Sequence, residues 1–186
     1  LNEVKQKPLP YKVQKIEEEW QKLRRAKAED FDSSPDTGIK QATIDKVGQS
    51  LTTIPDGFKP LKQIEKLLKD RKAAFFESKS LGWAEAELLA YGSLLTEGVP
   101  VRMSGQDVKR GTFSHRHAYF FDAHTNAAYC GLDNIDKGQQ KFHIYNSLLS
   151  EFGVLGFEYG YAMSSPHALV LWEAQFGDFV NGAQVI

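Results

Sequence analysis

The amino-acid sequence predicts an α/β protein, with a mostly helical region over residues 1–80 followed by a parallel-sheet region over residues 81–186. The first region holds 17 Lys and Arg against 13 Asp and Glu and has 6 of the 22 aromatic side chains, which is typical of a solvated segment. The second region holds 6 Lys and Arg against 11 Asp and Glu, with 16 aromatic side chains, which indicates a packed core. Within it, short continuous apolar stretches alternate with helical patterns, as in a parallel sheet covered by helices.

The composition of the whole chain excludes several classes of protein. Its 186 residues, of which 41% are hydrophobic and 25% charged, suffice for one globular domain of ordinary size. The net charge of −1 gives no electrostatic basis for binding nucleic acid, and no apolar stretch approaches the length that crosses a bilayer. We therefore expect neither a nucleic acid nor a membrane among its partners.

Helical spacing of apolar residues predicts three helices in the first region. The first covers residues 13–28, with acidic residues early and basic residues late, an order that suits the helix dipole. Thr43 is a candidate cap for a second helix that runs through Leu51, and the third helix covers residues 61–78. Proline, glycine and polar residues predict connecting segments at 1–12, 29–38 and 53–60.

The second region begins with a helix from Trp83 to Leu95 that carries a broad apolar stripe. We expect strands at residues 101–104, 142–145 and 168–172, and a helix over 149–163 between the last two. Shorter extended segments are expected at residues 117–121 and 127–130, around a turn. A further helix is expected to begin at Gly177.

Polar residues follow two of the predicted strands directly. The segment from Ser104 to Asp107 comes after the first strand, and the segment from Glu173 to Phe179 comes after the third. In open α/β sheets, ligands bind beyond the carboxyl ends of the strands, so both segments are candidates for a binding site. The residues alone also allow an ordinary turn at the first segment, and core packing of Phe176 and Phe179 at the second.

The predicted helix at residues 149–163 follows a polar segment. Ser147 or Ser150 can cap its start, and Glu151 falls in its first turn, where the helix dipole favours a carboxylate. Glycines at positions 153, 156 and 160 leave one face nearly bare, which allows close approach of another backbone or a flat ligand. The pattern alone favours a simple helix-start charge with ordinary helix–sheet packing.

Other kinds of catalytic chemistry find little support in the sequence. His115 and His117 lie two residues apart without a further clustered ligand, so we expect no metal site and favour anion contact or polar packing. The single cysteine, Cys130, excludes an internal disulfide, and as a nucleophile it would need a base that the sequence does not locate. The sequence has no phosphate loop, no dinucleotide fingerprint and no Gly-x-Ser-x-Gly elbow.

Three motifs, in this order and spacing, resemble those of one enzyme family. They are SGQDVKRGTFSHRHA at residues 104–118, LSEFGVLGFEYGY at residues 149–161 and LWEAQFGDF at residues 171–179. Together they closely resemble the decarboxylating first component of the 2-oxoglutarate dehydrogenase complex, a thiamine diphosphate enzyme of the transketolase-like superfamily. The resemblance implies that residues 81–186 form the N-terminal part of its pyrimidine-binding domain. Residues 1–80 resemble, more loosely, the helical connector that precedes this domain.

The resemblance also implies roles for five residues. Glu151 matches the glutamate that hydrogen-bonds the aminopyrimidine and favours the imino tautomer, whose nitrogen deprotonates the thiazolium carbon. Leu149 matches the apolar residue beneath the cofactor, and Phe179 matches the aromatic residue that stacks on the pyrimidine. Gln106 and Gln175 lie in motifs that line the same pocket, and we expect them to contribute to cofactor binding.

Other parts of the family's site are missing from this sequence. It lacks the Gly-Asp-Gly motif with a downstream Asn-Asn that holds magnesium and diphosphate, so we expect at most half of a site for thiamine diphosphate and Mg²⁺. In the family the site is shared between protomers, which implies a second protomer of a homodimer as a partner. The chain starts at Leu1 without Met and ends on apolar residues, and we expect it to be a fragment of a longer protein.

The resemblance implies an enzyme that decarboxylates the 2-oxo acid 2-oxoglutarate and passes the succinyl group to a lipoyl-bearing succinyltransferase component. The expected location is the cytoplasm if the protein is bacterial, or the mitochondrial matrix if it is eukaryotic. Two alternatives remain open. One is a related dehydrogenase that acts on 2-oxoadipate, and the other is a non-catalytic binding or assembly module.

Overall fold

The computed structural model describes residues 18–186. The chain divides into two compact units, Leu1–Asp36 and Thr37–Ile186. The connector expected at residues 1–12, and the start of the helix expected at residue 13, lie outside the described residues.

The described part of the first unit contains helix α2 (Glu18–Gln21) and the 3₁₀ turn η1 (Ala28–Phe31), neither of which buries a side chain. The continuous helix expected here is therefore wrong beyond the end of α2. Instead, the carboxylate of Asp30 accepts hydrogen bonds from two guanidinium nitrogens of Arg24, at 2.5 and 2.8 Å. A short helix that buries no face gains little from continuing, because most helix stability in proteins comes from packing.

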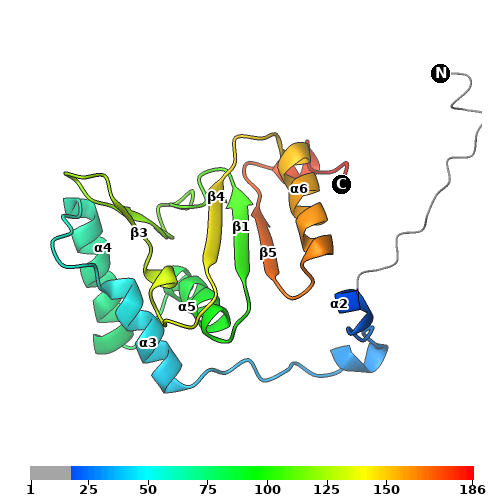
Figure 1. Ribbon diagram of the computed structural model, residues 1–186, viewed down its shortest axis with the longest axis horizontal. Helices are drawn as coiled ribbons and strands as arrows, with labels where there is room; N and C mark the ends of the chain where they lie inside the picture. The colour runs from blue at the N-terminus through cyan, green and yellow to red at the C-terminus, as the bar shows by residue number, and fades with distance from the viewer. Residues whose placement is uncertain (1–17) are drawn as a thin grey trace, which may run out of the picture. The chain divides into compact units, whose positions relative to one another are not determined.

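Three parallel strands form the sheet of the second unit, in the order β4-β1-β5. They are β1 (Val101–Gly105), β4 (Phe142–Asn146) and β5 (Leu169–Glu173). Figure 1 shows β1 between its two neighbours. The α/β fold with a parallel sheet, predicted from continuous apolar stretches, is thereby confirmed.

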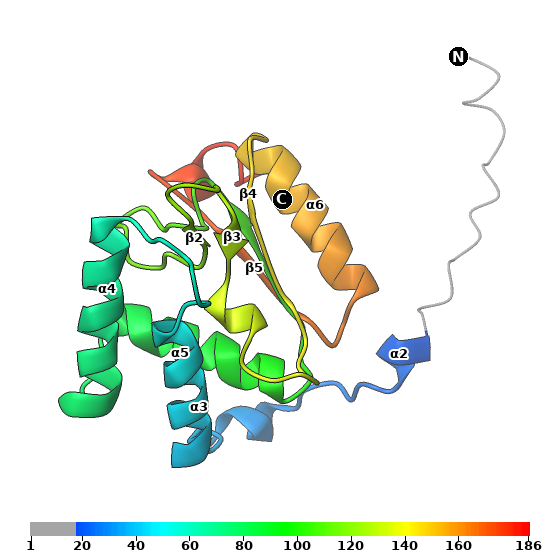
Figure 2. The ribbon, with the colours of Figure 1, turned by 60° about the vertical axis from the view of Figure 1, so that its left-hand side comes forward.

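Helices cover both faces of this sheet, as Figure 2 shows. Helices α3 (Gln41–Thr52), α4 (Lys62–Lys72) and α5 (Trp83–Thr96) lie on one side, and α6 (Glu151–Ser164) lies on the other. The π-helical turn η2 (Ala73–Glu77) extends α4. These four helices lie where the sequence predicts them, and none of the helices in residues 18–186 is long and apolar enough to cross a membrane.

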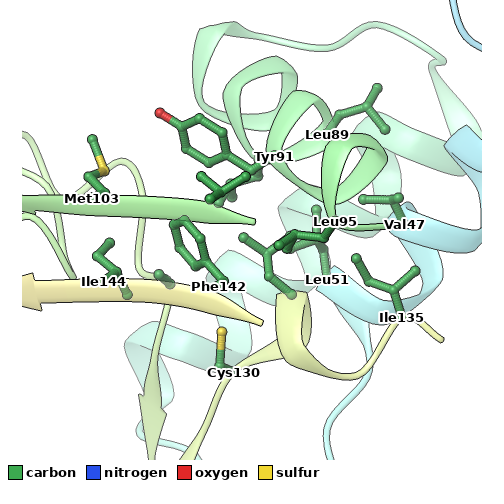
Figure 3. Packing of buried hydrophobic residues seen from close by; sticks show 14 of the residues in the cluster. Val47, Leu51, Leu89, Tyr91, Leu95, Met103, Cys130, Ile135, Phe142 and Ile144 are labelled. Atoms are coloured by element: carbon green, nitrogen blue, oxygen red, sulfur yellow. The ribbon is translucent and has the colours of Figure 1, made fainter. Parts of the chain in front are cut away.

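The main core lies between the sheet and helices α3 and α5 (Figure 3). Val47 of α3, Leu88 and Leu95 of α5, and Val101 of β1 are completely buried. Gly92 of α5 lets the two helices approach closely, since a Cβ at this position would lie 2.6 Å from Cγ1 of Val47. Helix α3 is therefore part of the same core as the sheet.

This packing changes the interpretation of the first 80 residues. The compact unit already begins at Thr37, so the solvated character expected for the whole first region is wrong for α3 and α4. Most side chains of these helices are polar or charged, yet one narrow apolar stripe on each suffices to join a larger core. The packing of the second unit thus continues across residue 81, and the start of the pyrimidine-binding domain expected there stays a prediction.

Two expected details differ from the structure. Helix α3 begins at Gln41 with Lys40 as its N-cap, so the expected cap at Thr43 is wrong. The helix expected from Gly177 is also wrong, because the structure has a single 3₁₀ turn there, η4 (Asp178–Val180). The backbone of Asn181, with φ of −109° and ψ of −116°, lies outside the helical region and ends this turn.

A short antiparallel pair, β2 (Phe120–Phe121) and β3 (Ala128–Tyr129), lies in the extended segments expected there. The turn between the two strands is organised by Asp122, whose carboxylate accepts three backbone N–H groups. They belong to Lys59, Thr125 and His124, at 2.6, 2.8 and 2.9 Å. These hydrogen bonds, that from Lys59 above all, hold the pKa of Asp122 well below its ordinary value.

Candidate functional site

The five residues implied by the family resemblance lie at one edge of the sheet. Strands β1, β4 and β5 end beside one another at Gly105, Asn146 and Glu173. Figure 1 shows that α6 begins at this end of the sheet and that the segment after β5 lies at the same end. The segments that leave the three strands carry Gln106, Leu149, Glu151, Gln175 and Phe179. The parallel direction of the strands therefore brings them to one edge, as the sequence predicts.

Glu151 is the first residue of α6, where the positive end of the helix dipole favours its negative charge. Of the two candidate caps, Ser150 is the N-cap, and its hydroxyl oxygen accepts the backbone N–H of Gly153 at 3.4 Å. The Glu151 side chain is half-buried. A Cβ on Gly182 would lie 2.7 Å from Oε2 of Glu151, so the C-terminal segment passes directly over this carboxylate.

Leu149 and Phe179 present apolar surface at the same edge. Leu149 is 58% exposed and Phe179 is 62% exposed, while the neighbouring Phe176 is 89% exposed. The core packing that the residues alone allowed for both phenylalanines is therefore wrong. Leu149 lines a shallow cavity of about 520 Å³. The other lining residues are Gln106, Asp107, Asn146, Ser147 and Leu148.

The two glutamines connect the ends of β1 and β5. Gln175 is buried, and its side-chain Nε2 donates to the backbone carbonyl of Gln106 at 2.8 Å. The backbone N–H of Gln175 donates to the carboxylate of Asp178 at 3.0 Å. Gln106 is exposed and lines the cavity beside Leu149. Gln175 thus acts here by holding the backbone of Gln106, and contact of either side chain with a cofactor stays a prediction.

The sequence did not reveal a buried charge cluster that joins two loops at this edge. Arg116 is completely buried and pairs with Glu87 of α5 and with Glu173 at the end of β5, at 2.6 and 2.5 Å. Arg116 also donates to the backbone carbonyl of Val108 at 2.7 Å. Burial alone would lower the pKa of Arg116, but its hydrogen bonds to both carboxylates outweigh this effect and raise the pKa. The cluster therefore fixes the loop after β1 to the end of β5.

The same cluster brings together three side chains of metal-binding type. Glu87, His115 and Glu173 have ligand atoms within 4.8 Å of one another. The Arg116 guanidinium already binds both carboxylates and lies 3.3 Å from Nε2 of His115. A cation would compete with it for the same oxygens, so we assign no metal to this group. The sequence signal for this cluster is Arg116, which stands between His115 and His117. The anions that Arg116 contacts are carboxylates of this chain.

Cys130 is excluded as a nucleophile by its surroundings. Its side chain packs in the main core (Figure 3). Burial raises the pKa of the thiol to about 12, so the reactive thiolate is scarce at neutral pH.

Comparisons with known proteins identify the family. Residues 79–186 match the family described as "Transketolase, pyrimidine binding domain". The 2-oxoglutarate dehydrogenase E1 component of Brucella anthropi is 46% identical over 177 residues, and those of Brucella ovis and Brucella canis are 45% identical over the same length. Each alignment covers 95% of this chain, which spans 18% of the length of these relatives. Since the family match covers more than half of the chain, the chain belongs to the transketolase pyrimidine-binding domain family.

Proposed function

We propose that this chain supplies the pyrimidine-binding part of a thiamine diphosphate site in the decarboxylating component of a 2-oxoglutarate dehydrogenase. The observation that carries this proposal is the position of Glu151, a half-buried carboxylate at the first residue of α6 and at the carboxyl edge of a parallel sheet. The family match and the names of the relatives support the same function.

The residues around Glu151 suit an aminopyrimidine ring. Such a ring offers nitrogen atoms for hydrogen bonding and two flat faces for apolar contact. Glu151 provides a carboxylate for a ring nitrogen, and Leu149 and Phe179 provide exposed apolar surface. Because the carboxylate is half-buried, less water competes for its hydrogen bond, which favours a proton shared with the ring.

Bound thiamine diphosphate supplies a thiazolium ring that takes up the electrons released when a 2-oxo acid loses carbon dioxide. In this chain, the Glu151 carboxylate would hold a proton at a pyrimidine nitrogen of the bound cofactor and would thereby favour the ring tautomer that can accept a proton elsewhere. Leu149 would support the ring by apolar contact, and Phe179 would stack against it. Ser150 caps α6 and so keeps the carboxylate at its place in the first turn.

We also propose that another part of the longer protein holds the diphosphate and Mg²⁺, and that a homodimer completes the site. The sequence lacks the Gly-Asp-Gly motif with a downstream Asn-Asn. Helix α6 and the segment after β5 expose several large apolar side chains, which is typical of a surface that another chain covers. They are Phe152, Phe157, Tyr159, Phe176, Phe179 and Val180. Light scattering on the longer protein tests this proposal, and an active monomer would contradict it.

The proposed substrate is 2-oxoglutarate, with transfer of the succinyl group to a lipoyl-bearing succinyltransferase component. The name shared by the relatives favours this acid over 2-oxoadipate. Rates measured with both acids in the longer protein separate the two substrates. Activity on neither acid would favour the non-catalytic module instead.

Substitution of Glu151 in the longer protein is the central test. Glu151→Gln keeps the size of the side chain but removes the group that shares the proton, and a loss of roughly 100-fold or more in rate is expected. The assay is 2-oxoglutarate-dependent release of carbon dioxide at saturating thiamine diphosphate and Mg²⁺. Glu97→Gln is the matched control, because Glu97 is an exposed carboxylate at the C-cap of α5, which leads into the amino end of β1.

Two results would contradict the proposal. Activity of Glu151→Gln close to that of Glu97→Gln would show that Glu151 is no more than a charge at a helix start. The 186-residue chain alone is expected to be inactive, because charge-assisted contacts to the diphosphate come from elsewhere. Turnover by this chain alone would contradict the divided site.

A further inference from the structure

Arg71, in the last turn of α4, is a buried cation without a counter-ion. Its side chain is 1% exposed, and no carboxylate of residues 18–186 forms an ion pair with it. Burial lowers the pKa of Arg71 to about 10, so the guanidinium is still charged at neutral pH. A buried charge that lacks a counter-ion costs free energy. The stability of the fold therefore gives no reason for an arginine at this position.

The hydrogen bonds of Arg71 show what this side chain holds. One terminal nitrogen, Nη2, donates to the backbone carbonyl of Arg116 at 2.5 Å, while Nε finds no partner within residues 18–186. Arg116 is in turn the centre of the buried charge cluster, and its own guanidinium binds two carboxylates and the carbonyl of Val108. Arg71 therefore fixes the backbone of the residue on which this cluster depends.

The loop that contains Arg116, residues 106–118, has a strained backbone. Asp107, Ser114 and His117 have φ values of 54°, 54° and 38°, which side chains disfavour. Such angles persist only where the surrounding structure imposes them. The conformation of this loop therefore depends on its contacts with other elements.

The two halves of the loop are anchored from different parts of the chain. In the first half, the backbone N–H of Lys109 donates to Oδ1 of Asn146 at 2.9 Å, and Asn146 lies within residues 79–186, which match the family. In the second half, residues 111–118, Arg71 is the only side chain of another described element that binds the backbone. The helix that carries Arg71 precedes the family match. A residue outside the common domain thus anchors a loop inside it.

Hydrogen bonds within the loop join its two halves. The N–H of Gly111 donates to the carbonyl of Asp107, and the N–H of Ala118 donates to the carbonyl of Lys109, both at 2.8 Å. A movement of the second half is therefore passed to Asp107, which lines the cavity beside Leu149.

Helix α4 is a firm support for this contact. Leu68, three residues before Arg71, is buried in a cluster with Phe120 of β2. The π-helical turn η2 that extends α4 carries Phe75, which is 4% exposed. A Cβ at Gly48 of α3 would lie 2.8 Å from Cδ1 of Phe75, so this turn packs closely against α3. Arg71 therefore reaches the loop from a helix that is itself held on both sides.

We propose that Arg71 is a positioning residue for the candidate site. It holds the backbone of Arg116 from α4, and the loop thereby keeps Asp107 in the wall of the cavity beside Leu149. The hold of Arg71 on the loop follows from the contacts of this chain alone. The further step, that the loop must be held for thiamine diphosphate to bind, rests on the proposed function.

Hydrogen–deuterium exchange on the 186-residue chain tests the hold on the loop. Arg71→Met fills similar space without a donor and should raise the exchange rate of residues 106–118 about 10-fold or more, because it removes a charge-assisted hydrogen bond. The exchange rates of β1 and α5 should stay unchanged. Lys69→Met is the matched control, since Lys69 is exposed on the same helix. Arg71→Lys keeps a charged donor and should raise the exchange rate of the loop less than Arg71→Met.

Two results would overturn the hold on the loop. One is an exchange rate of the loop that is the same in Arg71→Met as in Lys69→Met. The other is an equal rise in the loop, β1 and α5, which would show that Arg71 stabilises the whole fold and not the loop. If circular dichroism shows that Arg71→Met is unfolded, Arg71→Lys is compared with Lys69→Met by the same two criteria.

Cofactor binding by the longer protein tests the link to the site. Arg71→Met should weaken the binding of thiamine diphosphate, measured by calorimetry with Mg²⁺ present, about 3-fold or more relative to Lys69→Met. The reason is that the affinity falls with the fraction of molecules in which the loop has its binding conformation. Unchanged affinity together with faster exchange in the loop would contradict the link to the site. If the unmodified longer protein bound no thiamine diphosphate, the proposed function would be contradicted, whereas the exchange experiment would still decide whether Arg71 holds the loop.

Discussion

Replacing Gly92 with alanine tests the contact between α3 and α5 that joins α3 to the core of the sheet. A Cβ at position 92 would lie 2.6 and 3.0 Å from the two methyl carbons of Val47, and 3.2 Å from Cδ1 of Ile135. Carbon atoms in contact are normally about 3.5–4.0 Å apart, so the added methyl group must push its neighbours aside. Such overpacking costs about 1–3 kcal/mol, against about 1 kcal/mol gained when alanine replaces glycine inside a helix.

The decisive quantity is the coupling between Gly92 and Val47. Val47→Ala removes both methyl groups that the new Cβ would meet, and alone it should cost about 2 kcal/mol from lost burial and the cavity left behind. In the double variant, the methyl group at position 92 enters the space that Val47 vacates. We therefore expect the free energy of unfolding of the double variant to exceed the value obtained by adding the two single effects. The expected excess is about 1 kcal/mol or more.

The assay is equilibrium unfolding of the 186-residue chain in urea, followed by circular dichroism. Gly160→Ala is the matched control, because a Cβ at Gly160 of α6 would meet no atom within 4 Å. The free energy of unfolding of this variant should rise by up to about 1 kcal/mol, because alanine has a higher helix propensity than glycine. Effects of Gly92→Ala and Val47→Ala that add to within about 0.5 kcal/mol would refute the contact, and with it the shared core of α3 and α5.

Two further predictions concern charged side chains. Arg116→Met leaves Glu87 and Glu173 without their buried partner and should lower the free energy of unfolding by about 3–5 kcal/mol. Lys46→Met breaks an exposed ion pair and should lower the free energy of unfolding by less than about 1 kcal/mol. If urea unfolding showed equal decreases in the free energy of unfolding for the two variants, the importance of burial for the ion pairs of Arg116 would be contradicted. Because hydrogen bonds lower the pKa of Asp122, its contribution to stability is present above roughly pH 4 and is lost as the pH falls towards the lower folded-state pKa. The urea midpoint of Asp122→Asn should therefore fall less steeply below roughly pH 4 than that of the unmodified chain, and parallel curves would contradict this.

The sheet and the place of the candidate site follow from local patterns in the sequence. A continuous apolar stretch such as residues 169–171 identifies a parallel strand without any knowledge of its neighbours, although all five residues of β5 are only partly buried in the structure. Once the strands are parallel, their carboxyl ends must lie at one edge. Glu151 and Gln106 therefore come to this edge because of strand direction alone.

Features that depend on distant partners could not be predicted in this way. Arg116 finds its two carboxylates 29 and 57 positions away along the chain, and no local pattern marks them. Val47 lies among polar and charged residues, and its burial depends on a glycine in another helix. The prediction of a helix from Gly177 is wrong because the helical spacing of apolar residues does not predict the backbone angles of Asn181.

The order of the strands has a consequence for how the chain folds. Strand β1 occupies the middle of the sheet, yet both of its partners come later in the chain, since Val101 pairs with Phe142 and with Leu169. Each pairing closes a long loop, and the entropy of closure is lost before the contacts form, which makes parallel sheets slow to assemble. Helices α3, α4 and α5 lie closer together in the sequence and are expected to assemble first. During synthesis, β1 is therefore expected to rest against a helical layer until β4, α6 and β5 emerge in that order, so the edge of β1 that pairs with β5 stays open to water for the longest time.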